Sequence, residues 1–212
     1  MIGQSVSEVI RARSASIWER AVNHRLFGEI ATDQVSDAVF NQYLRIEFGF
    51  IDTAAVVMGF AIAKAPDLET RRHLSRGLNG LTTDQCLFFE AALKSAPEAT
   101  PIRPPRADGL HNHFLTIARN EEYPEIVACM LAAEWMYETW CRRAIATPSS
   151  RPHIADWVAL HAGGPFAAQV AWMRAQLDSV AEQGRNVDRL FQVFHEALEQ
   201  EIRFHDAAYE SV

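Results

Sequence analysis

The chain has 212 residues, a net charge of −7 at neutral pH and a hydrophobic fraction of 49%. This length suits one large domain with a sizeable core, and a charged fraction of 22% is ordinary for a globular protein. The acidic balance and the scattered basic residues disfavour a nucleic-acid-binding face, so we expect no nucleic-acid partner.

The cysteines indicate a reducing compartment. Cys86, Cys129 and Cys141 are odd in number and far apart, which fits neither a disulfide framework nor a zinc motif. Together with the absence of an apolar signal core in the first eight residues, this predicts a cytoplasmic protein. The most apolar window, Thr53 to Ala65, is too short to span a bilayer, so we also expect no membrane partner.

Apolar residues recur at helical spacing through nearly the whole chain, and no segment alternates as a strand does. The pattern predicts about eight helices, over residues 6–22, 33–65, 68–96, 108–119, 123–145, 154–160 and 166–181, and from 187 onward. The predicted fold class is all-α, a single helical bundle with residues 1–212 as one domain.

Local signals mark some of the helix ends. Thr32 and Asp33 are expected to cap the second helix, and Asp67, which follows Pro66, to cap the third. Gly77 and Gly80 are expected soft points within that third helix.

Three carboxylates, Glu47, Glu134 and Glu201, lie on otherwise apolar helical stretches. Glu201 comes three residues after Leu198 and three before Phe204, which places it at the edge of the buried stripe or inside it. An acid there is costly unless it has a partner or a chemical role. We therefore expect the three carboxylates to line one polar pocket in the bundle.

Short segments along the chain carry a further signal through their order. They are Trp18 with His24-Arg25-Leu26-Phe27, then Phe40 to Leu44 followed by Ile46 to Phe50, Ala63-Lys64-Ala65-Pro66-Asp67, Cys129 to Tyr137, Trp157 to His161, and Gln200 to Asp206. In this order they resemble the TenA/thiaminase II family over nearly the whole chain. The resemblance implies a haem-oxygenase-like bundle, a homodimer or homotetramer, and a hydrolase that acts on a small aminopyrimidine in thiamin salvage.

The resemblance also implies roles for individual residues. Glu201 matches the family's essential C-terminal Glu, which would shuttle a proton to the leaving amine. Glu47 replaces the Asp that binds the amino and ring-nitrogen edge of the pyrimidine. Tyr137 and Phe204 match aromatic residues of the pocket, and Phe48 is expected to join them in sandwiching the ring.

Several positions depart from the family's pattern. The nucleophilic Cys falls at Ala133, which cannot form a thiolate, and Cys129 lies one helical turn away. Phe50 and His161 replace active-site Tyr residues, and both are expected to contact the substrate. With Glu134 beside the vacated position, the chain resembles the family's Cys-less branch, in which Glu134 would activate water.

A further Tyr of the family falls near His111 or Leu110. His111 and His113, two residues apart, face different sides of a helix and cannot share a metal ion. Each is expected to be capped or solvated.

Two other functions remain open. The chain could be a pyrimidine-binding or regulatory homologue that has lost the chemistry, or a metal-dependent oxidase on the same fold. Two pairs with i, i+4 spacing, His195–Glu199 and Glu201–His205, could hold a metal. The final-helix pattern of di-iron oxygenases on this fold is incomplete here, because Ile202 occupies one ligand position, so no metal and no other cofactor is expected.

Overall fold

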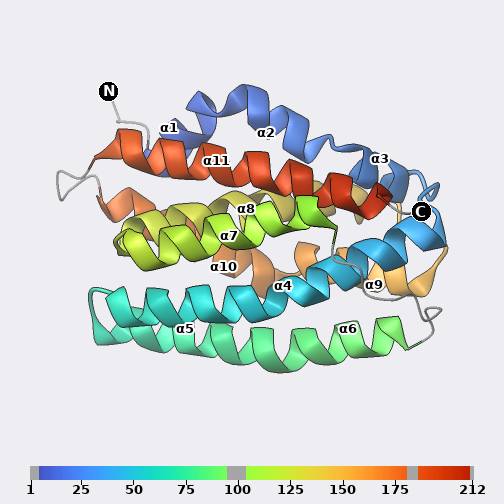
Figure 1. Cartoon of the computed structure of the whole chain (residues 1–212), viewed down its shortest axis with the longest axis horizontal. Helices are drawn as coiled ribbons and strands as arrows, with labels where there is room; N and C mark the ends of the chain where they lie inside the picture. The colour runs from blue at the N-terminus through green and yellow to red at the C-terminus, as the bar shows by residue number, and fades with distance from the viewer. Residues whose placement is uncertain (1–4, 95–103, 181–185, 211–212) are drawn as a thin grey trace. The chain divides into compact units, whose positions relative to one another are not determined.

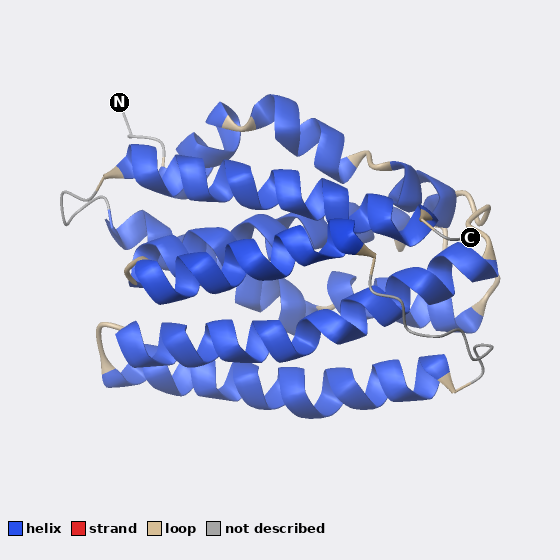
Figure 2. Cartoon of the chain, in the orientation of Figure 1, coloured by secondary structure: helices blue, strands red, loops and turns tan. Residues whose placement is uncertain are grey.

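The structure is a computed structural model, and it describes residues 5–94, 104–180 and 186–210. Within those ranges the regular structure is helical and there is no strand, which confirms the all-α prediction (Figure 2). The chain groups into two compact units, one of residues 1–35 and 127–202 and the other of residues 36–126 and 203–212. That the chain forms a single domain stays a prediction.

The first unit is built largely from the two ends of the chain. Its helices are α1 (Val6–Arg13), α2 (Ala15–Val22), α3 (Arg25–Ala31), most of α8 (Tyr123–Ala144), α9 (Pro152–Ala162), α10 (Gly164–Val180) and most of α11 (Val187–Asp206). The predicted helix over residues 6–22 is divided at Ser14. Helix α3 was not among the predicted helices; His24 Nδ1 accepts a hydrogen bond from the backbone N–H of Leu26 (3.2 Å) and caps its start.

The second unit contains the middle of the chain. It holds α4 (Asp37–Lys64), α5 (Leu68–Gly80), α6 (Cys86–Leu93), α7 (Pro105–Asn120), the start of α8, the end of α11 and a 3₁₀ turn over Ala207–Tyr209. The long α4 packs against α5, α6 and α7, and Figure 1 shows α5 and α6 following one another along α4. A π-helical turn, Leu81–Gln85, separates α5 from α6, directly after the expected soft point Gly80.

The cap of α4 differs from the predicted residues, and the cap of α5 agrees with the prediction. Ser36, rather than Thr32 or Asp33, caps α4 by accepting a hydrogen bond from the backbone N–H of Val39 (3.2 Å). Asp33 binds the Ser150 backbone N–H (3.2 Å) in the same unit instead. Asp67 caps α5 as predicted, since its Oδ1 accepts a hydrogen bond from the backbone N–H of Thr70 (2.7 Å).

The apolar window from Thr53 to Ala65 lies almost entirely within α4, which is much longer than the window itself. As a whole, α4 has 28 residues and a window of mean hydropathy 1.7 that is 33% buried, enough by length and composition to cross a membrane. The expectation that this segment is too short is therefore wrong for the helix that contains it. Because α4 packs against α5, α6 and α7, it needs an apolar surface even in a protein that does not enter a membrane. The absence of a membrane partner therefore stays our prediction.

Candidate active site

Glu201 is deeply buried in the first unit. Only 2% of the residue is exposed, and Ala197, Leu198 and Phe204 on the same helix, α11, are buried as well. The helical spacing around Glu201 had predicted a position at or inside the buried stripe, and the structure places it inside. A buried carboxyl in an apolar stripe is costly, so it indicates a structural or chemical role.

Cys129, on α8, is close enough to Glu201 for the charge of that carboxylate to affect the pKa of its thiol. Burial raises the pKa of the Cys129 thiol well above its usual value, and the negative charges of Glu201 and Glu196 raise it further. Cys129 is therefore a protonated thiol at neutral pH, which is the wrong state for a nucleophile.

The middle of α8 has accessible surface at only two neighbouring positions. Residues 127–132 and 135–137 are buried, whereas Ala133 and Glu134 between them are partly exposed. The exposed surface of Glu134 comes from atoms other than Oε2, which is shielded from solvent. This oxygen also has no hydrogen-bond partner in the described part of the chain. Burial raises the pKa of Glu134 to about 8.

Tyr137 and His161 form a stacked pair in the same unit, with ring centroids 5.2 Å apart and an interplanar angle of 28°. His161 Nδ1 lies 2.9 Å from the backbone carbonyl of Trp157, and because a carbonyl only accepts, Nδ1 carries the proton. Burial lowers the pKa of His161 to about 4. His161 is thus a neutral imidazole in a fixed tautomer, with its lone pair on Nε2.

Aromatic residues of the second unit surround His111. Phe50 packs edge-on against His111 (4.9 Å between ring centroids) and Phe204 (5.8 Å). A hydrogen bond of 2.7 Å joins Thr53 Oγ1 to His111 Nδ1, and only 2% of His111 is exposed. Of the two expected states of His111, the solvated one is therefore wrong, whereas its Nδ1 is capped by the Thr53 hydroxyl. Its place in the i, i+3, i+4 stripe of buried α7 residues was the signal in the sequence.

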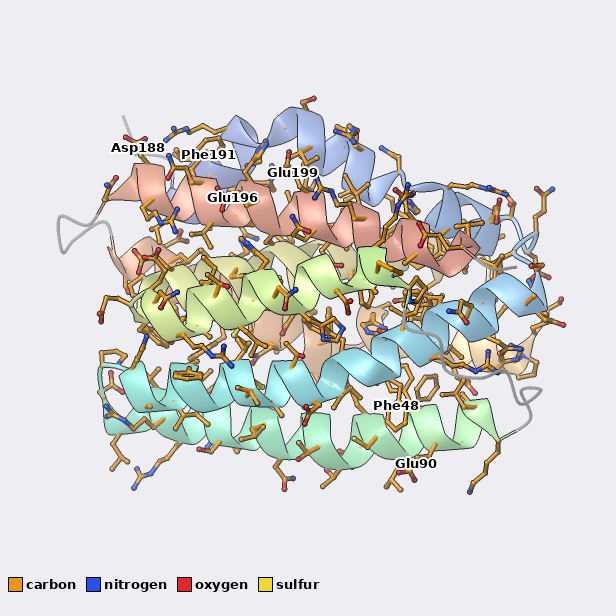
Figure 3. The ribbon with its side chains drawn as sticks, in the orientation of Figure 1. Phe48, Glu90, Asp188, Phe191, Glu196 and Glu199 are labelled. Carbon is orange, nitrogen blue, oxygen red and sulfur yellow. The ribbon has the colours of Figure 1, made fainter. Side chains whose placement is uncertain are left out.

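Phe48 and Phe50 do not lie together, because residues two apart point to different sides of a helix. Phe48 extends from α4 and stacks on Phe89 of α6, with centroids 5.6 Å apart (Figure 3). Glu47, also on α4, is partly exposed and belongs to the second unit. The roles of Phe48 and Glu47, and a pocket shared by the three carboxylates, stay predictions.

The candidate metal ligands of α11 are spread along the helix. Glu199 lies on its accessible part (Figure 3), whereas Glu201 and His205 are buried, and the His195 ring packs on Phe191 with centroids 5.5 Å apart. Among the described residues, no three His, Cys, Asp or Glu side chains lie close enough together to hold a metal ion.

A small pocket of the first unit is lined by none of the predicted site residues. Its lining is Ile30, Ala144, Ile145, Thr147, Pro148, Ser149, Ala155 and Val158. Its cavity volume of about 20 Å³ holds a water molecule rather than a pyrimidine ring.

Comparison with known proteins identifies the family. The model of the TENA/THI-4/PQQC family matches residues 11–211. The chain belongs to this family. It is 21% identical to an aminopyrimidine aminohydrolase of Helicobacter pylori, covering 97% of this chain and 99% of that one. It is 23% identical to the aminopyrimidine aminohydrolase of Bacillus subtilis, covering 83% and 77%.

Solved structures support the fold of this family member. A TenA homologue from Pyrococcus furiosus is similar with a TM-score of 0.89 at 21% identity, over 96% of this chain and 100% of that one. A domain from Shewanella denitrificans described as having a haem-oxygenase-like fold is similar with a TM-score of 0.76 at 14% identity, over 99% and 94%. The fold is therefore haem-oxygenase-like, as the sequence resemblance implied.

Proposed function

We propose that the protein hydrolyses a C–N bond of a small aminopyrimidine in thiamin salvage, and that carboxyl groups rather than a cysteine carry the chemistry. The observation that carries the proposal is Glu201, which is 2% exposed in the helix that resembles the family's C-terminal motif. The names of the relatives from Helicobacter pylori and Bacillus subtilis support the substrate class.

The state of the cysteines supports a mechanism without a covalent thioether. The position expected for the nucleophile is Ala133, and Cys129 is a buried thiol with a raised pKa. A thiol that stays protonated attacks carbon slowly. Direct attack by water, assisted by proton transfer through Glu201, needs no thiolate.

Aromatic side chains would hold the ring. In the first unit, the stacked faces of Tyr137 and His161 offer a flat, weakly polar surface. We propose that these two residues contact the substrate. Contacts of the substrate with Phe50 and Phe204, with Phe48, and with the Glu47 carboxylate stay predictions from the resemblance.

The test is ammonia release from an aminomethyl-pyrimidine, with Glu201→Gln beside the parent. Gln keeps the shape of the side chain and removes the titrating group, so we expect turnover to fall by a factor on the order of 100 or more. The matched control is Glu199→Gln on the same helix, which should keep the parent's rate. A parent that binds the pyrimidine in a thermal-shift assay but releases no ammonia would support a binding homologue and contradict this proposal.

We also propose that the protein is cytoplasmic and, like the family that it resembles, a homodimer or homotetramer with two-fold symmetry. Light scattering at micromolar concentration should give a mass of at least twice the 23.8 kDa of one chain, and a monomer mass would refute the assembly.

A further inference from the structure

Glu134 is the one carboxyl of the first unit that lies beside Ala133, at the only accessible stretch in the middle of α8. Residues 127–132 and 135–137 on either side are buried, so a ligand that reaches this part of the helix meets Ala133 and Glu134 first. Because Ala133 has no functional group, Glu134 supplies the polar chemistry available there.

The surroundings of Glu134 disfavour its charged form. Its Oε2 is shielded from solvent and receives no hydrogen bond in the described part of the chain. A carboxylate oxygen in that position would be a buried charge without a donor, which costs more than burying the neutral acid. Consistent with this, burial raises the pKa of Glu134 to about 8, and no nearby charge contributes to the shift.

On the helix of Glu134 itself, Arg142 pairs with Glu138 (3.1 Å) rather than with Glu134.

The cations nearby are already engaged. The guanidinium of Arg174, from α10, lies 4.3 Å from the ring of Trp135, the next residue of α8, and binds Glu8 of α1 at 2.5 Å. Arg11 of α1 lies 5.3 Å from the same ring and binds Glu8 at 2.9 Å. Both arginines share the carboxylate of Glu8, and neither of these ion pairs involves Glu134.

We propose that Glu134 enters the reaction as a neutral carboxylic acid and donates its proton to the leaving nitrogen, while Glu201 accepts the proton of the attacking water. This inference rests on the proposed function and divides its proton transfer between two residues. It also reverses the role that the sequence resemblance assigned to Glu134, since activating water requires a carboxylate.

The step balances without a further reactant. The water oxygen forms a bond to the pyrimidine-bound carbon, and the C–N bond breaks with its electron pair going to nitrogen. Nitrogen takes the Glu134 proton, and Glu201 takes one proton from the water. Exchange with solvent then restores both carboxyl groups.

This assignment defines a substrate class. A neutral amine or amide nitrogen is a poor leaving group until it is protonated, so it depends on the acid. A quaternary ring nitrogen, as in a thiazolium or pyridinium group, leaves as a neutral base and needs no proton. The protein should therefore depend on Glu134 for the first kind of leaving group and not for the second.

The test compares two pyrimidines that differ in this respect, one with an anilinomethyl and one with a pyridiniomethyl group, since neither nitrogen titrates near neutral pH. For the parent, kcat/KM on the anilino compound should fall as the pH rises through about 8. Glu134→Gln should lower that value by about 100-fold and abolish the pH limb, but change the pyridinio reaction by less than about threefold. Glu138→Gln, one turn along α8, is the matched control and should leave both reactions unchanged.

Two kinetic results would overturn the inference. A parent rate on the anilino compound that rises through about pH 8 would show that Glu134 acts as a base. Equal losses on both compounds in Glu134→Gln would reduce Glu134 to a positioning role.

A separate measurement keeps the inference distinct from the proposed function. If the parent turns over neither compound, the proposed hydrolysis fails, but the protonation of Glu134 can still be measured by NMR of protein labelled with ¹³C at the Glu carboxyl carbons. One carboxyl carbon should titrate near pH 8 in the parent and be missing in Glu134→Gln. The absence of such a resonance from the parent would refute the neutral acid.

Discussion

Replacing Glu134 by Gln should change the pH dependence of folding stability in a direction that the structure fixes. Burial raises the folded-state pKa of Glu134 from 4.5 to about 8. The native protein therefore keeps a proton that the unfolded chain has lost. The parent's stability is full below about pH 4.5 and falls as the pH rises toward 8. Gln cannot ionise, so the variant escapes this loss.

The size of the effect follows from the shift. A difference of roughly 3.5 pKa units at about 1.4 kcal/mol each sets an upper limit of about 5 kcal/mol. Because the residue is partly exposed, water relaxing around the carboxylate should reduce this, and we expect about 2–4 kcal/mol. The free energy of unfolding of Glu134→Gln, relative to the parent, should rise by that amount between about pH 5 and pH 9.

The assay is urea unfolding of the parent, Glu134→Gln and the control Glu138→Gln at about pH 5, 7 and 9. Each variant is compared with the parent at the same pH, so other titrating groups cancel. A stability difference between Glu134→Gln and the parent that does not depend on pH would refute the reasoning, because it would mean that Glu134 has an ordinary pKa.

Three other substitutions test single contacts. Lys64→Met should lower the free energy of unfolding by about 1–2 kcal/mol, because Lys64 Nζ donates to the carbonyls of Ala118 (2.9 Å) and Glu121 (2.5 Å) at the end of α7; an unchanged urea midpoint would count against that cap. Because burial lowers the pKa of His161, the parent should lose up to about 3 kcal/mol of its free energy of unfolding as the pH falls from 6.5 toward 4, and His161→Phe should not. Acid-unfolding curves of the parent and the variant that run parallel would contradict this. Trp157→Ala should cost about 3–5 kcal/mol, because Trp157 is fully buried, and thermal unfolding that changes little would show that its site collapses around the gap.

The helices were predictable because they depend on local signals. Apolar spacing gave the fold class, Asp67 gave the start of α5, and Gly80 marked its end. The formation of α3 was not predictable in this way, because it depends on a histidine, His24, that caps with a ring nitrogen. Histidine is not among the residues preferred at helix N-caps, so the pattern of residues alone did not predict this helix.

The candidate site was predictable in its chemistry but not in its protonation states. The position of Glu201 followed from helical spacing, and the structure places it in the core. The burial of His111 could have been predicted from the helical stripe of α7. The neutral forms of Glu134 and His161 could not, because they depend on how completely the folded chain buries each group, and that leaves no local mark in the sequence.

Ammonia release by Cys129→Ala and Glu201→Gln, measured side by side on an aminomethyl-pyrimidine, tests the central claim most directly. If carboxyl groups carry the hydrolysis, Cys129→Ala should keep most of the parent's rate, while Glu201→Gln should lose a factor on the order of 100 or more. The opposite pattern, with activity lost on removal of the thiol and kept without the carboxylate, would contradict the account.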